Sequence, residues 1–155
     1  IFSSSKILNK YIKQTDKKYF NGNILVAEDN ETNRMLISIM LEERGLNYTI
    51  VNNGQEAVDQ AMKKDFDIIF MDINMPVLDG ISATRQLRAS NYNKPIVSLS
   101  ANVIADDILS FKEAGMDQCL NKPIVAEELD KVLANYLNKD SFNNIEFDTI
   151  DAQDI

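Results

Sequence analysis

The chain has 155 residues, of which 45% are hydrophobic, and this length predicts one globular domain with short extensions. Asp and Glu outnumber Lys and Arg by 24 to 16, so the net charge of −8 argues against nucleic acid or an anionic membrane as the main partner. The absence of histidine excludes Ser-His-Asp and Cys-His catalysis, histidine-ligated metals and a phosphohistidine within the chain.

Two further features bear on the location of the chain. No apolar run reaches the ~20 residues that a membrane-spanning helix requires. The one cysteine, Cys119, allows no internal disulfide, which fits a reducing compartment, and we expect a cytoplasmic domain whose parent chain can be membrane-anchored.

The two ends of the chain differ in composition from its middle. Residues 1–22 are polar with a few apolar residues at helical spacing, so we expect a linker that can carry one short helix. Residues 140–155 are polar and acidic, and we expect them to leave the domain as an extension or linker. The first residue is Ile1 rather than Met, which leads us to expect a piece excised from a longer protein.

Between these ends, residues 23–139 alternate between short apolar runs and helical patterns. In chain order, we expect a strand at 24–27, a helix ending at Gly45, a strand at 48–51, a helix at 55–63, a strand at 67–71, a helix at 81–89, a strand at 95–99, a helix ending at Gly115, a strand at 118–121 and a final helix reaching Leu137.

Four of the five predicted helices have an apolar face that we expect to be buried. In chain order, these faces contain Leu36, Ile39 and Met40; Ala57, Val58, Ala61 and Met62; Ile104, Ile108 and Phe111; and Leu129, Val132, Leu133, Tyr136 and Leu137.

Five strand–helix units in succession predict an α/β fold in which a doubly wound parallel sheet carries helices on both faces. The runs at 24–27 and 68–71 are apolar without alternation, as strands buried on both faces require. In such sheets the functional groups gather at the carboxyl ends of the strands.

Polar side chains follow four of the predicted strands directly. Glu28 and Asp29 follow the first strand, Asp72 the third, Ser100 the fourth and Lys122 the fifth. Because the carboxyl ends of parallel strands lie at one edge of a sheet, we expect three carboxylates, a hydroxyl and an ammonium group to converge there.

The chemistry of this cluster indicates a divalent cation and a phosphoryl group. Two carboxylates ~5 Å apart repel by roughly 3 kcal/mol at an effective dielectric near 20, and a hard cation such as Mg²⁺ relieves this repulsion. With the cation and Lys122 offsetting charge, one carboxylate can attack a phosphoryl group, and Ser100 can then donate a hydrogen bond to the new phosphate. Each residue alone could be a helix-end acid, a cap or part of a turn, but their coincidence on one edge favours a single site.

The polar motifs at this edge resemble those of a known protein family. Glu28-Asp29-Asn30 and the segments 71–80, 95–102, 115–117 and 122–124 resemble, in order and spacing, the receiver domains of two-component response regulators over residues 23–139. The resemblance implies a flavodoxin-like sheet with strand order 2-1-3-4-5.

The resemblance also implies a role for each acidic residue. Asp72 would accept the phosphoryl group. Asp29 and Asp72 would ligate Mg²⁺ directly, Glu28 would act on the metal through water, and Asn74 would supply its backbone carbonyl.

The remaining site residues follow from the same comparison. Lys122 would pair with the phosphoryl group, and its bond to Pro123 is often cis in relatives. Ser100 would be the switch hydroxyl, and Gly80 would let the loop after the third strand turn into its helix. Cys119 departs from the family pattern, because relatives commonly carry Tyr or Phe there. We interpret Cys119 as a small buried apolar side chain rather than a redox group.

The resemblance implies a phosphodonor outside the chain, either a histidine kinase or a histidine phosphotransfer domain. We expect the parent to be a hybrid sensor histidine kinase, with the receiver of a separate response regulator as the alternative, and no binding of nucleic acid or membrane by this fragment. A haloacid-dehalogenase-like phosphatase would need an acid where Asn74 stands. A pseudo-receiver with an inactive site would not retain every charged position.

Overall fold

The computed structural model describes residues 19–101 and 105–137, which form a parallel sheet with helices on both faces. Its strands are β1 (Asn23–Ala27), β2 (Asn47–Val51), β3 (Ile68–Asp72), β4 (Ile96–Ser100) and β5 (Gln118–Asn121). Their order is β2-β1-β3-β4-β5, and each adjacent pair is parallel. The predicted α/β fold and its strand order are therefore confirmed.

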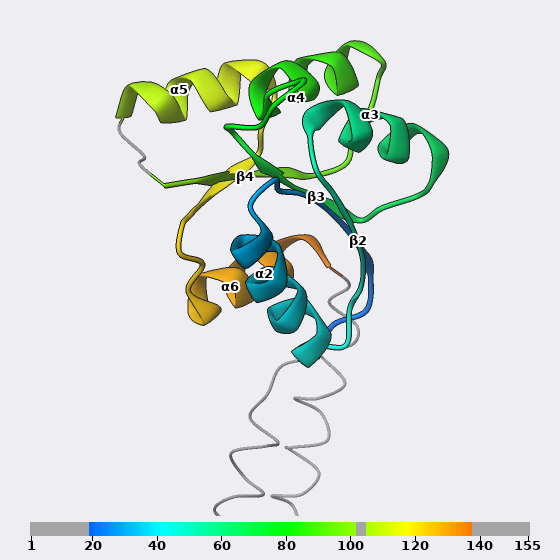
Figure 1. The fold of residues 1–155 in the computed structure, drawn as a ribbon, viewed down its shortest axis with the longest axis vertical. Helices are drawn as coiled ribbons and strands as arrows, with labels where there is room; N and C mark the ends of the chain where they lie inside the picture. Colours follow the sequence, from blue (N-terminus) through cyan, green and yellow to red (C-terminus); the bar gives the residue numbers. More distant parts are fainter. Residues whose placement is uncertain (1–18, 102–104, 138–155) are drawn as a thin grey trace, which may run out of the picture.

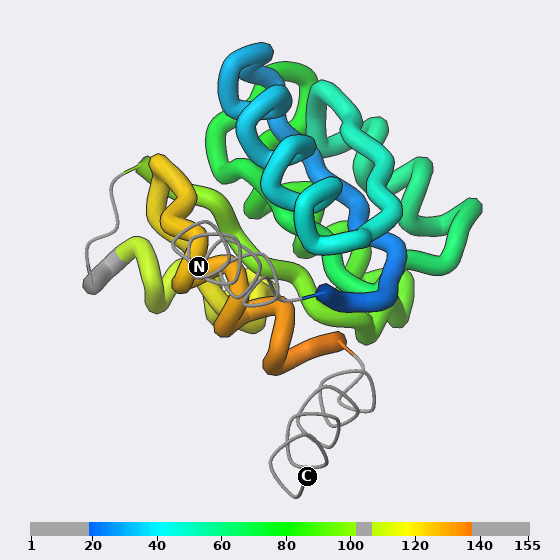
Figure 2. Tube along the Cα trace, turned by 90° about the horizontal axis from the view of Figure 1, so that it is seen from below, coloured from blue at the N-terminus to red at the C-terminus, as the bar shows by residue number. Residues whose placement is uncertain are grey.

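The helices form one layer on each side of the sheet (Figure 1). They are α2 (Glu31–Glu43), α3 (Gly54–Lys63), α4 (Gly80–Ala89), α5 (Ala105–Ala114) and α6 (Ala126–Tyr136). Helices α3, α4 and α5 cover one face, and α2 and α6 cover the other. Figure 2, seen from the α2–α6 side, shows these two helices lying over the strands.

Alternation along the strands divides the core into two clusters. On β1, Ile24 and Val26 belong to the cluster that includes residues of α2 and α6, whereas Leu25 and Ala27 belong to the one that includes residues of α3 and α4. This is the two-residue period of a strand with helices on both faces. All residues of β3 and β4 are buried, so the polar residues at their ends are held by a rigid core.

Side-chain caps set the starting points of three helices. The side chains of Asn30, Asn53 and Asp79 accept hydrogen bonds from backbone N–H groups three residues later, at 3.0, 2.8 and 2.8 Å. Each bond satisfies a donor that the first helical turn leaves free. The loops at the carboxyl edge of the sheet therefore turn into their helices at defined residues.

The predicted buried faces were correct for α6 and partly wrong elsewhere. In α2, Leu36 and Ile39 are exposed, and the buried residues are Ile37, Met40 and Leu41. Apolar residues occur on all sides of this helix, so the periodicity of its apolar residues could not show which face is buried. Met62 on α3 and Ile108 on α5 are also exposed, at 57% and 42%.

Several expectations concern residues outside the described part of the chain. These are the burial of Ile104, residues 1–18 of the linker expected over residues 1–22, and the extension expected over residues 140–155. Phe20, at the described end of the first of these ranges, is 5% exposed and belongs to the core. Within residues 19–101 and 105–137, no helix is both long and apolar enough to cross a bilayer.

Candidate functional site

Three carboxylates meet at the carboxyl edge of the sheet. Glu28, Asp29 and Asp72 each offer an oxygen, and these oxygens lie within 4.8 Å of one another. Glu28 and Asp29 follow β1, whereas Asp72 ends β3, which pairs directly with β1. Glu28 is only 1% exposed and Asp72 5%, whereas Asp29 faces solvent. The predicted acidic cluster is therefore present, with one side open.

Lys122 joins this cluster from the carboxyl end of β5, the outermost strand on the β4 side of the sheet. Its Nζ lies 3.0 Å from both carboxylate oxygens of Glu28 and 3.0 Å from Oδ2 of Asp72. The backbone N–H of Lys122 donates to the carbonyl of Ser100 at 2.8 Å, and the bond from Lys122 to Pro123 is cis. The lysine is thus fixed by its backbone as well as by its side chain.

Burial of these charges alters their proton affinities. Burial raises the pKa of Glu28 to about 7 from its ordinary value of 4.5, and the hydrogen bond and charge of Asp72 act in the same direction. Lys122 and a hydrogen bond from Asn33 offset part of this rise. Burial lowers the pKa of Lys122, but its bonds to the two carboxylates outweigh burial and leave this pKa raised. The cluster holds more negative charge than one lysine neutralises.

Ser100 occupies the edge beside Asp72. Leu99 is the register partner of Asp72, so Ser100 lies one residue further along the neighbouring strand β4. Ser100 is 9% exposed, so it is largely buried next to the acidic cluster.

The loop after Asp72 is pinned close to the site. The N–H of Asn74 donates to Oδ1 of Asp72 at 3.3 Å, and the N–H of Gly80 donates to the carbonyl of Ile73 at 3.0 Å. A Cβ on Gly80 would lie 2.1 Å from the carbonyl oxygen of Asp72, so only glycine fits there. This close approach explains the glycine that begins α4.

Two features of the site were not predicted from the sequence. Asn33, on the first turn of α2, hydrogen-bonds Glu28 and lines a small cavity with Glu28 and Lys122. The cap at Asn30 fixes where α2 starts, so this contact could have been found from helical geometry. Val77 adopts a φ of +70°, and the N–H of Leu78 donates to the carbonyl of Pro76 at 2.7 Å, which closes a strained three-residue turn.

Comparison with known families identifies this arrangement. The profile of the response regulator receiver domain matches residues 24–134. The chain belongs to this family. It is therefore a receiver domain of two-component signal transduction, and its strand order and acidic edge are those expected from the resemblance.

The similar curated proteins are much longer than this chain. Sensor histidine kinase RcsC of Salmonella typhi is 33% identical over 138 residues, which cover 87% of this chain and 15% of RcsC. Sensor protein GacS of Pseudomonas syringae pv. syringae is 34% identical over 118 residues, which cover 73% of this chain and 13% of GacS. The receiver thus corresponds to a small part of each sensor protein.

Solved receiver structures have the same fold. The receiver domain of sensor histidine kinase PA1611 from Pseudomonas aeruginosa is 39% identical with a TM-score of 0.70, covers 75% of this chain and 97% of that one, and has magnesium coordinated in its active site cleft. The Saccharomyces cerevisiae complex of the histidine phosphotransfer protein Ypd1 with the receiver domain of Ssk1 gives 28% identity and a TM-score of 0.75, over 81% of this chain and 94% of that one.

Proposed function

We propose that Asp72 accepts a phosphoryl group in a Mg²⁺-dependent reaction and that the phosphorylated domain acts as a signalling switch. The observation that carries this proposal is the meeting of three carboxylates within 4.8 Å, with Lys122 at 3.0 Å from Asp72. Such a cluster is unfavourable without a cation, and it leaves one carboxylate beside an ammonium group that can offset phosphate charge.

The donor set of the edge suits Mg²⁺. We propose that Asp29 and Asp72 ligate the ion directly, that the backbone carbonyl of Asn74 is a third ligand and that Glu28 acts through water. Carboxylate and carbonyl oxygens are the hard donors that Mg²⁺ prefers, and the exposure of Asp29 leaves room for water and phosphate. When bound, the ion would offset charge on the oxygens of the incoming phosphoryl group.

The transfer would begin with attack of an Asp72 carboxylate oxygen on phosphorus. As this O–P bond forms, the P–N bond to the donor imidazole breaks, and its electron pair leaves with the imidazole, which binds a proton from solvent. Lys122, already 3.0 Å from Asp72, would pair with a phosphoryl oxygen of the acyl phosphate. Ser100 would donate its hydroxyl hydrogen to another phosphoryl oxygen.

We propose that the donor is a histidine kinase or a histidine phosphotransfer domain, because the chain itself contains no histidine. The kind of partner is supported by the Ypd1–Ssk1 complex. Three exposed apolar residues of α2, Met35, Leu36 and Ile39, offer a docking surface, and Leu36 lines the small cavity that Glu28 and Lys122 also line. This surface is apolar rather than basic, which supports a protein partner over nucleic acid.

We also propose that the receiver spans residues 23–139 within a hybrid sensor histidine kinase, joined through residues 1–22 and 140–155. Similarity to RcsC and GacS supports this architecture over a separate response regulator. A cytoplasmic location would follow, because a histidine kinase draws its phosphoryl group from intracellular ATP.

Incubation with acetyl phosphate and Mg²⁺ tests the phospho-acceptor role without a protein donor. We expect about one phosphoryl group per chain, measured by intact mass, and none in the Asp72→Asn variant, because an amide cannot form the acyl phosphate. Asp59→Asn, at an exposed position on α3, is the matched control and should be phosphorylated normally. A receiver releases its one phosphoryl group slowly, so uptake in Asp72→Asn, or rapid turnover of many equivalents of acetyl phosphate as a phosphatase would give, would overturn the proposal.

A further inference from the structure

Glu28 is the most deeply buried of the three carboxylates at the site, and its charged partner is shared. It is 1% exposed, compared with 5% for Asp72. Lys122 Nζ lies 3.0 Å from both Glu28 oxygens, but it also lies 3.0 Å from Oδ2 of Asp72. If Lys122 pairs with a phosphoryl group on Asp72, its contact with Glu28 must weaken. A second partner is therefore needed to keep the Glu28 carboxylate in one orientation.

Asn33 is a second polar partner of Glu28. Its side chain hydrogen-bonds the carboxylate from the first turn of α2, and because an ionised carboxylate only accepts, the amide N–H of Asn33 is the donor. The backbone N–H of Asn33 donates to Oδ1 of Asn30, the cap of α2, at 3.0 Å. Asn33 is thus a short, neutral donor held on a capped helix end, and its contact with Glu28 does not depend on Lys122.

A small cavity beside Glu28 shows why this donor matters. Its volume is about 20 Å³, which is room for roughly one water molecule. Three of its lining residues are polar, namely Glu28, Asn33 and Lys122. The others have apolar side chains, and they are Leu36, Ile37, Leu99, Pro123 and Ile124. Bulk water cannot hydrate Glu28 freely on this side, so Asn33 supplies a donor where solvent is largely excluded.

We propose that Asn33 is a positioning residue for cation binding, which holds the Glu28 carboxylate in the orientation that the metal site requires. The proposal rests on the proposed function, in which Glu28 acts on Mg²⁺ through water. A glutamate side chain has several torsions, and ordering them when a cation binds costs conformational entropy. Because Asn33 orders Glu28 beforehand, this cost is reduced and the site binds the cation more tightly.

Asn33→Leu in the full chain tests this role with Mg²⁺ as the ligand and no phosphodonor. Leucine has the branching of asparagine but donates no hydrogen bond, and its apolar groups keep a replacement water out of the cavity. We expect the dissociation constant for Mg²⁺, measured by isothermal titration calorimetry, to rise roughly tenfold. Should Asn33→Leu fail to fold, Asn33→Ala removes the same donor and the same result is expected. An unchanged dissociation constant would overturn the proposal.

Kinetics with acetyl phosphate separate positioning from a part in the transfer itself. The Mg²⁺ concentration that gives half the maximal rate of phosphorylation should rise by the same factor in Asn33→Leu. The rate at saturating Mg²⁺ should stay within about twofold of that of the unmodified chain, because Asp72 and Lys122 are intact. A lower saturated rate at an unchanged half-maximal concentration would contradict a positioning role.

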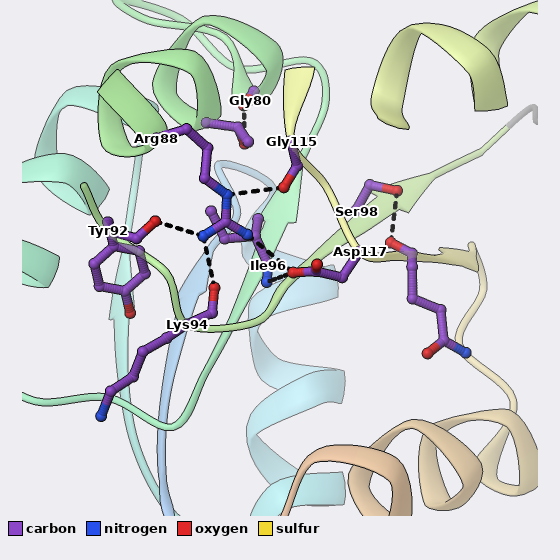
Figure 3. A network of polar contacts seen from close by, with 10 residues as sticks. Gly80, Arg88, Tyr92, Lys94, Ile96, Ser98, Gly115 and Asp117 are labelled. Carbon is purple, nitrogen blue, oxygen red and sulfur yellow. Dashed lines mark hydrogen bonds and ion pairs between the residues drawn. The ribbon is translucent and has the colours of Figure 1, made fainter. Parts of the chain in front are cut away.

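Arg88 provides a control for loss of stability (Figure 3). Its guanidinium group donates to the carbonyls of Gly115, Tyr92 and Lys94 and to Oδ2 of Asp117, at 2.9, 2.7, 2.9 and 2.9 Å. Lys94 and Asp117 precede β4 and β5, so this network lies at the amino ends of these strands, opposite the acidic site. Arg88→Lys lacks the planar fork and should lower the urea midpoint of unfolding without changing Mg²⁺ affinity.

Two further variants assign the effect to the contact between Asn33 and Glu28. Thr32→Ala, at an exposed position in the same turn of α2, should bind Mg²⁺ like the unmodified chain. In a Glu28→Ala background, Asn33→Leu should change Mg²⁺ affinity by less than about twofold, because the group that Asn33 holds is gone. A full tenfold loss in this background, or in Arg88→Lys alone, would overturn the proposal.

The outcomes also distinguish this proposal from the proposed function. An unmodified chain that binds no Mg²⁺ at millimolar concentrations, or takes up no phosphoryl group, would contradict the proposed function and the positioning role with it. An unmodified chain that does both, together with an Asn33→Leu variant of equal Mg²⁺ affinity, would overturn the positioning role alone and leave the phosphoryl site standing.

Discussion

Glu28 is the residue at which burial and charge conflict most sharply. Its carboxylate is almost fully buried between Lys122 and Asp72, and its pKa is raised to about 7. Near neutral pH, and without a cation, this carboxyl group is therefore partly protonated. A bound cation and a proton compete for the same charge, so the site couples metal binding to pH.

The raised pKa of Glu28 predicts how stability depends on pH in the presence of a chelator. The folded chain binds the proton of the Glu28 carboxyl group more tightly than the unfolded chain does. Protonation of Glu28 therefore contributes its full stabilisation of the folded chain below pH 4.5, and this contribution is lost as the pH rises through about 7. Relative to Glu28→Gln, which does not titrate, the unmodified chain should lose up to about 3 kcal/mol of unfolding free energy across this interval. Urea unfolding at pH 5 and pH 8 measures the difference. The raised pKa of Lys122 affects stability only above this pH interval. If the unfolding free energies of the two chains differed by the same amount at both pH values, the prediction would be contradicted.

The loop from β3 to α4 shows how an element can carry local strain. Its ends are held by Gly80 and by the bond from the Gly54 N–H to the Leu78 carbonyl at 2.9 Å. Between them, Val77 is 80% exposed at a φ of +70°, which a β-branched residue rarely adopts. Because the Val77 side chain is exposed, its packing does not offset the steric cost of this φ angle. The fixed ends of the loop must therefore hold Val77 in this conformation.

Relief of this strain should stabilise the domain. Val77→Gly should raise the unfolding free energy by about 1 kcal/mol, because glycine adopts a positive φ without steric cost. Val77→Ala is the matched control, since alanine removes the β-branch but keeps a Cβ, which still opposes a φ of +70°. This control should gain much less than Val77→Gly, because the steric cost of the positive φ largely remains. Equal effects in the two variants, measured by urea unfolding, would show that Val77 is not strained.

Helix α2 shows what periodicity can and cannot predict. The sequence placed the helix and its end at Gly45 correctly, because glycine and the apolar pattern are local signals. The prediction of the buried face was wrong for Leu36 and Ile39, because consecutive apolar residues on α2 are compatible with more than one apolar face. Contacts with β1 and α6 decide which face is buried, and those contacts are not local.

A pair of leucines on α2 tests the observed face. Leu41 is 0% exposed, so Leu41→Ala should cost about 2–5 kcal/mol of unfolding free energy. Leu36 is 42% exposed, so Leu36→Ala should cost well under about 1 kcal/mol. The reverse order of these two losses in urea unfolding would favour the face first predicted from the sequence.

At the scale of the whole molecule, the sheet separates two surfaces and holds the site at the edge between them. Helices α2 and α6 lie on one face, where the exposed apolar residues of α2 offer a surface for a donor (Figure 1). Helices α3, α4 and α5 lie on the other face.

The sequence predicted the site better than it predicted the contacts around it. The site residues lie at or directly after the carboxyl ends of strands, and a parallel sheet brings these ends together whatever the details of packing. They are Glu28, Asp29, Asp72, Ser100 and Lys122. Arg88 and Asp117 lie 29 residues apart, and their contact depends on how α4 and α5 pack. No local pattern reports such a contact.

The most direct test of the account locates the phosphoryl group itself. The chain would be treated with acetyl phosphate, with and without Mg²⁺, and then reduced with borohydride, which converts an aspartyl phosphate to homoserine. We predict homoserine at position 72 in peptide mass spectra, formed only when Mg²⁺ was present. Homoserine at another acidic residue, or equal labelling without the ion, would contradict the assignment of Asp72 as a metal-assisted phospho-acceptor.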